Sequence, residues 1–135
     1  MYDHTRYTAN ANDASLASTG IKHRVFAGVR PLIVRGFCAV ITTAPTVTAP
    51  VINVKRRPTP GSSSGEVSIG TLTLPVATAI GKSVYKEGFA VRINPGEECV
   101  FDCTTAATAG AATLCLDVEE SPERLANEAD AIASA

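Results

Sequence analysis

The cysteines and histidines are the residues of this chain that could do chemistry. The chain has four cysteines, which are Cys38, Cys99, Cys103 and Cys115. On a strand, Cys99 and Cys103 would lie on one face, because side chains alternate between the two faces. A zinc site needs about four ligands in tetrahedral reach, and only His4 and His23 could add nitrogen, neither within a paired motif. We therefore predict no metal site and free, half-buried thiols.

Catalysis would need a base beside a nucleophile, or two carboxylates that share a site. His23 lies between Lys22 and Arg24, which is typical of an exposed basic edge. Asp102 and Asp117 could be neighbours across a hairpin, but both alternate with apolar residues and fit a solvated surface better. The chain has no nucleophile-elbow, phosphate-loop, dinucleotide-binding or zinc-protease motif. We predict that the protein is not an enzyme and uses no cofactor.

The charges are segregated although the net charge is only −1. No acidic residue lies between Asp13 and Glu66, a span with seven basic residues. From Glu97 onward there are nine acidic residues and one basic residue. Such asymmetry favours an interaction surface, but it also fits basic strands that pair with acidic strands inside one domain. The sequence leaves both interpretations open.

The run Lys55, Arg56 and Arg57 is the strongest basic cluster and precedes a loop rich in proline, glycine and serine. Nucleic-acid binding usually adds further basic residues or stacking aromatic side chains, and neither is nearby. We predict no nucleic-acid partner. These three residues are instead candidate contacts with an acidic protein surface.

The elements that must position these residues are β-strands. The chain has 135 residues, of which 45% are hydrophobic and 19% charged, with no tryptophan; this suits one folded domain. Apolar and polar residues alternate over 21–120, with proline and glycine at the joints, which predicts an all-β, antiparallel domain, either a β-sandwich or a small barrel. Residues 89–120 look like a three-stranded antiparallel meander. A slip of the alternation at Gly70 indicates a β-bulge.

The ends of the chain are expected to differ from this domain. Residues 1–20 are polar and are predicted to form an arm, with Tyr2, Tyr7 and Leu16 as tentative anchors on a partner. Residues 121–135 are predicted to form a short helix or tail, with Ser121 as its N-cap. No apolar leader or membrane-spanning run is visible, so we expect use without secretion and no membrane partner.

Three segments together resemble the head-decoration, or cement, proteins of tailed bacteriophages. They are RRPTPGSSSGEVSIGTLTLP, GKSVYKEG and VRINPGEECVFDCTTAATAGAATLCLDVEESPE, and the resemblance covers roughly residues 21–123. It implies a β-sandwich or jelly-roll-like domain that binds the major capsid protein and reinforces contacts between capsid subunits. It also implies synthesis in the host cytoplasm, a place on the outer capsid surface of the virion, self-association as a dimer or trimer, and no catalytic residues. A head fibre, a tail component and a small ligand-binding β-module are the alternatives.

Overall fold

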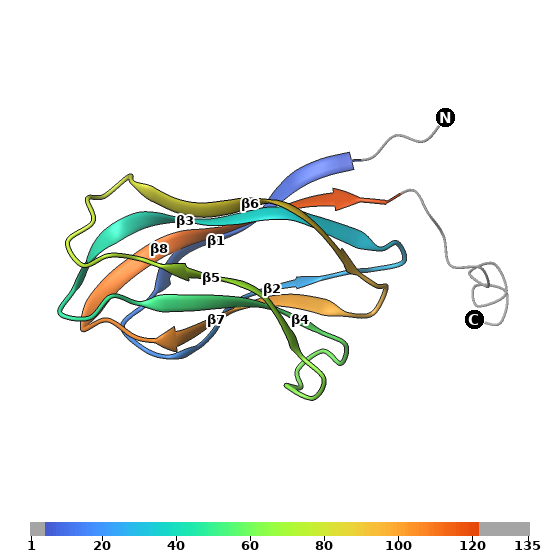
Figure 1. Ribbon diagram of the computed structural model, residues 1–135, viewed down its shortest axis with the longest axis horizontal. Helices are drawn as coiled ribbons and strands as arrows, with labels where there is room; N and C mark the ends of the chain where they lie inside the picture. Colours follow the sequence, from blue (N-terminus) through green and yellow to red (C-terminus); the bar gives the residue numbers. More distant parts are fainter. Residues whose placement is uncertain (1–4, 122–135) are drawn as a thin grey trace, which may run out of the picture.

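A computed structural model describes residues 5–121 as two four-stranded antiparallel sheets packed face to face (Figure 1). This confirms the predicted β-sandwich. No helix occurs within these residues, and hence none there is long and apolar enough to cross a membrane. The strands are β1 (Thr5–Ser15), β2 (Gly20–Phe26), β3 (Leu32–Thr46), β4 (Val51–Arg57), β5 (Val67–Thr73), β6 (Ser83–Ile93), β7 (Glu98–Thr105) and β8 (Ala109–Glu120).

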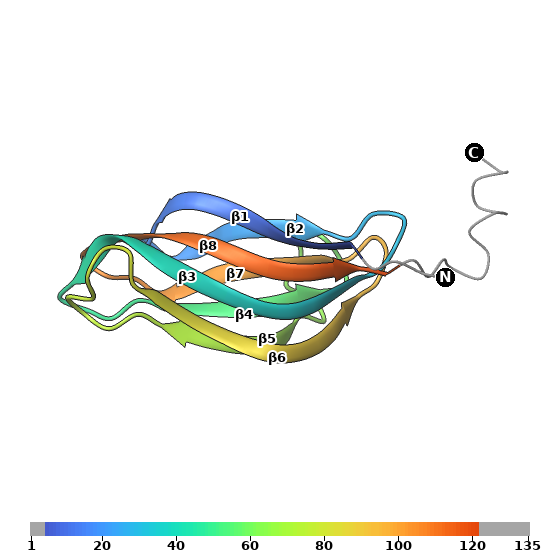
Figure 2. The same cartoon turned by 90° about the horizontal axis from the view of Figure 1, so that it is seen from above.

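The strand order is that of a jelly roll. Sheet A has the order β1-β8-β3-β6 and sheet B the order β2-β7-β4-β5. Figure 2 shows β1 and β6 as the two edges of sheet A. Apart from β4 and β5, strands that follow each other in the chain belong to different sheets, so most loops cross between the layers at the two ends of the sandwich.

The core lies between the sheets, where every second side chain points inward. Phe37 of sheet A meets Phe101 of sheet B edge to face at 6.4 Å and stacks on Phe89 at 5.1 Å. The register of β4 and β5 shifts opposite Gly70, which confirms the predicted bulge. A Cβ atom at Gly70 would lie 3.0 Å from Cζ of Phe37, so a larger residue there would require this ring to shift.

The predicted meander over 89–120 is wrong in its pairing, although its strands and turns are present. β6 and β8 both lie in sheet A with β3 between them, and β7 lies in sheet B. The tight turn at 94–97 therefore joins the two layers instead of two neighbours in one sheet. Turn chemistry fixes where the chain reverses but not whether the flanking strands exchange hydrogen bonds.

The predicted boundary of an N-terminal arm at residue 20 is also wrong. Residues 5–15 form β1, which pairs with β8 along the edge of sheet A. Ala9, Ala11 and Ala14 pack against the core, and Leu16 is fully buried, so it cannot anchor a partner. Alanine gives only a weak period-2 signal, which explains why the strand looked like a polar arm. Tyr2 and the predicted C-terminal helix lie outside the described residues.

Candidate functional site

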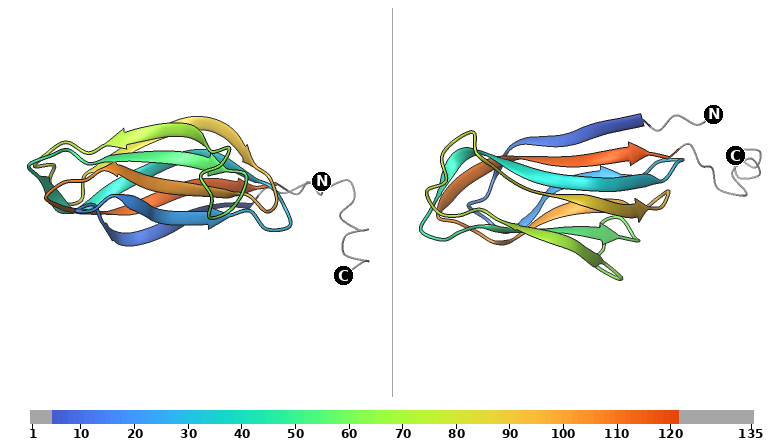
Figure 3. Two further views of the ribbon diagram at one scale, coloured as in Figure 1. Left: turned by 90° about the horizontal axis from the view of Figure 1, so that it is seen from below. Right: turned by 45° about the horizontal axis from the view of Figure 1, so that its top comes forward.

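The outer side of sheet B is a ladder of charged side chains covered in part by the loop 58–66. Glu98 and Asp102 of β7 alternate with the inward-facing Cys99, Phe101 and Cys103, which places both carboxylates on the outside. The loop joins β4 to β5 and crosses the outer side of the sheet (Figure 3). Its Gly61 N–H donates a 2.9 Å hydrogen bond to Oε1 of Glu98, which fixes the loop to the sheet.

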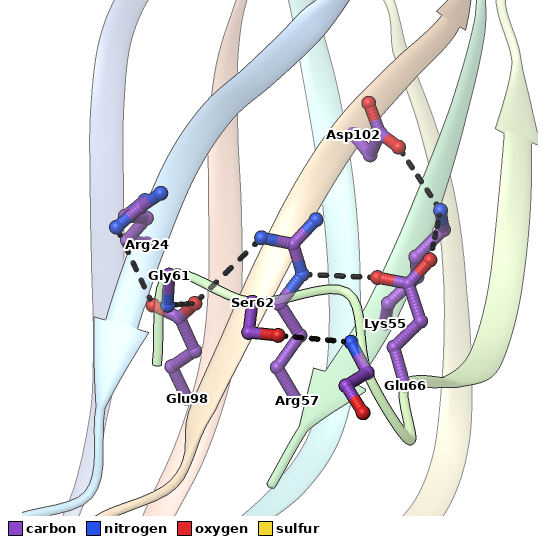
Figure 4. Close-up of polar contacts among 9 residues, drawn as sticks. Arg24, Lys55, Arg57, Gly61, Ser62, Glu66, Glu98 and Asp102 are labelled. Atoms are coloured by element: carbon purple, nitrogen blue, oxygen red, sulfur yellow. Dashed lines mark hydrogen bonds and ion pairs between the residues drawn. The ribbon is translucent and has the colours of Figure 1, made fainter. Parts of the chain in front are cut away.

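Lys55, Arg57 and Glu66 connect the ladder across β4 and the end of the loop (Figure 4). Nζ of Lys55 lies 3.0 Å from Oδ2 of Asp102 and 3.0 Å from Oε1 of Glu66. Nε of Arg57 donates to Oε2 of Glu66, also at 3.0 Å. The hydrogen bonds to Asp102 and then Glu66 raise the pKa of Lys55. The hydrogen bond from Lys55, followed by that from Arg57, lowers the pKa of Glu66.

Glu98 is the buried member of this ladder and has no exposed surface. Its Oε1 lies 3.9 Å from Nη1 of Arg57, and its Oε2 lies 4.0 Å from Nη1 of Arg24. Oε2 has no hydrogen-bond partner among the described residues. The carboxylate therefore depends on the Gly61 N–H and on two longer-range positive charges, all drawn together in Figure 4.

These contacts favour the interpretation that basic strands pair with acidic strands inside one domain. The jelly-roll order places basic β4 beside β7 and basic β3 beside acidic β8. Arg56 makes a two-pronged pair with Glu97 at 2.9 and 3.0 Å, and Arg35 pairs with Glu119. Lys55, Arg56 and Arg57 thus each have a carboxylate partner in their own domain. Their binding to another protein stays a prediction.

The residues that could have done chemistry are kept apart by the fold. Asp102 lies on the outer side of sheet B and Asp117 on that of sheet A, so they are not neighbours. The His23 ring packs 5.4 Å from Phe101, and its Nε2 lies 3.0 Å from the carbonyl oxygen of Ala9. His23 is thus half-buried where β1 meets β2, not an exposed basic edge. Residues 5–121 contain no group of three metal-ligating side chains that could hold an ion.

The cysteines divide into two pairs. Cys99 and Cys103 are buried on the inner face of β7. Burial raises the pKa of both thiols, that of Cys99 to about 12. Cys38 of β3 and Cys115 of β8 lie half-buried and directly opposite each other in sheet A. All four thiols are free.

A shallow groove with both apolar and charged residues in its lining lies at the end of the sandwich. This is the end where β1 begins and β8 ends in Figure 1. The volume of the groove is about 370 Å³, and Phe26 and Val29 on its wall are 55% and 60% exposed. Burial, and then the charge of Glu120, raise the pKa of Tyr7 in the same wall. We call this feature the terminal groove, and its lining includes Tyr7, Phe26, Val29, Arg30, Leu32 and Glu120.

Three exposed apolar residues lie in the loops at the opposite end, and we call them the far tip: Val47, Val76 and Ile80. Val47 has a φ of 69° and is the centre of a γ-turn closed by a 2.8 Å bond from Thr48 N–H to the carbonyl of Thr46. This conformation is rare and strained for a β-branched residue. A 2.9 Å hydrogen bond from the N–H of Ala77 to the carbonyl oxygen of Pro45 ties the loop after β5 to the end of β3.

Sequence reasoning identified Tyr7 but missed the other exposed residues of both ends, and it missed the burial of Glu98. One signal was available for the ends. Val29 directly follows Gly28 and lies two residues before Pro31, and Val47 lies between Pro45 and Pro50. Large apolar residues are unusual in such turn-forming segments, where polar residues dominate. The burial of Glu98 had no local signal, because a loop 37 residues earlier in the chain covers it.

Comparisons with known proteins do not assign this chain to a family. No protein-family model and no curated protein sequence matches the chain. The fold is similar to a solved structure described under the words "Bacillus endospore appendages form a novel family of disulfide-linked pili", with a TM-score of 0.47 and 16% identity over 90% of this chain and 93% of that chain. A likeness of this degree does not carry a function from one protein to another.

Proposed function

We propose that the protein is a non-catalytic structural subunit that binds to the surface of a larger protein assembly. On the basis of the resemblance to decoration proteins, we propose that this assembly is the outer capsid of a tailed bacteriophage and that the partner is the major capsid protein. The observation that carries the proposal is the gathering of exposed large apolar side chains at the two ends of a rigid sandwich. Among residues 6–121, Val67 at the start of β5 and Tyr85 on β6 are the exposed large apolar side chains that belong to neither the terminal groove nor the far tip.

The terminal groove is the end that we assign to the capsid. Aromatic side chains are enriched at the centres of protein interfaces, and a tyrosine contributes both apolar area and a hydroxyl group. Tyr7 and Phe26 meet this description, while Arg30 and Glu120 supply a charged rim. An apolar side chain from a capsid loop would fill the groove, and the rim would pair with polar groups around it.

The test compares two double variants on purified particles that lack the protein. Phe26→Ser with Val29→Ser removes the apolar wall of the groove, and Val47→Ser with Ile80→Ser is the matched change at the far tip. All four side chains are more than half exposed, so we expect the melting temperatures to change little. We expect the groove variant to bind at least about tenfold more weakly, which corresponds to about 1.4 kcal/mol, and the tip variant to bind normally.

The other outcomes discriminate as well. If only the tip variant loses binding, the wrong end has been assigned to the capsid. If the wild-type protein does not bind particles, the capsid is not its partner. Quantitative mass spectrometry of native particles should find a copy number comparable to that of the major capsid protein. Sedimentation of the free protein would show whether it forms the dimer or trimer that the resemblance implies.

The presence of apolar residues at both ends favours one further candidate, a subunit of a head fibre or tail. A contact between two unlike surfaces of identical subunits repeats without closing and produces filaments. Insertion of the far tip of one copy into the terminal groove of the next would be such a contact. A handful of copies per particle, or concentration-dependent polymers that either double variant abolishes, would favour this candidate over decoration.

A further inference from the structure

The outer side of sheet A holds a pair of thiols that nothing above assigns to a role. Cys38 lies between the inward-facing Phe37 and Ala39, and Cys115 between the inward-facing Leu114 and Leu116. Both thiols therefore point to the outer side. The register pairs the two residues directly across β3 and β8, the two inner strands of the sheet.

The spacing of this pair suits a disulfide. Directly opposed residues of an antiparallel ladder have Cα atoms about 4.5 or 5.5 Å apart, and disulfides span Cα separations of about 4.4–6.8 Å. Because the register already places the two cysteines opposite each other, bond formation needs no movement of either strand to a new register. Burial, and then the neighbouring Cys115 thiol, raise the pKa of Cys38 to about 12.

The second cysteine pair is a built-in comparison. Cys99 and Cys103 are four residues apart on one strand, and a strand rises about 3.3 Å per residue, so their Cα atoms lie about 13 Å apart. That separation exceeds the reach of a disulfide. The pair that looks close in the sequence cannot bond, while the pair that is distant in the sequence can.

We propose that Cys38 and Cys115 form a reversible disulfide that staples β3 to β8 when the protein meets an oxidising disulfide. This inference is independent of the proposed docking function. One thiolate attacks a sulfur of a small disulfide R–S–S–R, forming a mixed disulfide and releasing R–SH. The second thiolate then attacks the mixed disulfide and releases the second R–SH. The two protein sulfurs lose two electrons and two protons, and the small disulfide gains both.

The raised pKa of Cys38 should make its exchange with a small disulfide slow. A thiol that keeps its proton exchanges slowly, because the thiolate is the reactive form. Asp117 adds to this protection, since its charge also raises the pKa of Cys38. Tyr85, the partner of Cys38 on β6, and Asn10, the partner of Cys115 on β1, flank the pair in the same row of the sheet.

The test treats the folded full-length protein with glutathione disulfide at about pH 8.5, near the pKa of an ordinary thiol. We expect the loss of two hydrogen atoms by intact mass and one linked peptide pair containing Cys38 and Cys115. The melting temperature should rise by about 5 °C or more, and dithiothreitol should reverse the change. Cys38→Ser and Cys115→Ser should each abolish both the link and the rise.

The matched control is the Cys99→Ala, Cys103→Ala double variant, which keeps the outer pair and should still close. If its core does not tolerate the change, peptide mapping of the wild-type protein answers the same question. Glutathione retained on both Cys38 and Cys115, a link between two copies, or a link that contains Cys99 or Cys103 would each overturn the proposal.

Discussion

The outer side of sheet B and the two ends of the sandwich meet solvent in opposite ways. On sheet B, charged side chains from β4, β7 and the loop 58–66 pair with one another. At the terminal groove and the far tip, large apolar side chains are exposed. The first region uses its side chains for the stability of the domain itself, and the second leaves them available to another molecule.

This difference teaches where to look for function in a chain with strong charge segregation. Exposed ion pairs add only about 0–1 kcal/mol each, yet they occupy the groups that would otherwise attract a partner. The basic cluster that looked like a binding patch in the sequence is thus the less available surface. The apolar loops, which carry no charge pattern, are the more available one.

The largest effect is expected at the buried centre of the sheet B ladder. Glu98→Ala would leave the Gly61 N–H without its acceptor and would remove the nearby counter-charge of Arg57. Breaking a buried polar contact from one side costs about 2–4 kcal/mol, and urea unfolding would measure it. Glu98→Gln keeps an acceptor for Gly61 and should cost less. Equal stability of Glu98→Ala and the wild type would contradict a structural role for this carboxylate.

The pH dependence of stability gives a second, smaller test of the same ladder. The pKa of Glu66 is lowered in the folded state, so its contribution is present above the unfolded value of about 4.3 and is lost as pH falls through the folded pKa. The pKa of Lys55 is raised, so its contribution is present below about 10.4 and is lost as pH rises through the folded pKa. Stability should be highest between these limits.

The variant Lys55→Met removes the main cause of the lowered pKa of Glu66. The free energy of unfolding that is lost between neutral and acid pH should therefore be smaller by about 1 kcal/mol, a modest value because the pair is close to solvent. Urea midpoints measured across the acid range would record the change. If Lys55→Met loses as much stability at acid pH as the wild type, the pKa of Glu66 does not depend on this lysine. The conservative variant Lys55→Arg keeps the charge, so its stability should fall at acid pH nearly as much as that of the wild type.

Much of the fold could be predicted from the sequence because strands and turns have local causes. The alternation over Val51–Arg57 and the proline, glycine and serine residues that follow place β4 and the loop correctly. Which strands pair with each other in a sheet is not set by residues that are neighbours in the sequence. The turn at 94–97 joins two layers because β7 pairs with β2 and β4 in sheet B, and these partners are distant from the turn in the sequence.

The candidate sites were less predictable for the same reason. The contacts of Lys55 with Asp102 and of Cys38 with Cys115 both arise from strands that are distant in the chain. Once the jelly-roll order is known, the two interpretations of the charge pattern no longer have equal weight. Reversing Arg56 and Arg57 to glutamate should lower the melting temperature, because both arginines pair with carboxylates of their own domain.

The smallest effect separates the two ends of the molecule from each other. Val47 at the far tip is 77% exposed with a φ of 69°, whereas Val29 in the terminal groove is 60% exposed and has no positive φ. A positive φ costs a non-glycine residue about 1–3 kcal/mol, while glycine adds about 0.5–1 kcal/mol of unfolded-state entropy. Val47→Gly should therefore raise stability by about 1 kcal/mol, and Val29→Gly should lower it by a similar amount. Urea unfolding of the pair decides the matter: if both variants lose stability equally, Val47 stores no strain and the far tip is an ordinary loop. Opposite signs would mean that the chain keeps a strained, exposed valine at a stability cost, as expected for a residue retained to make contact.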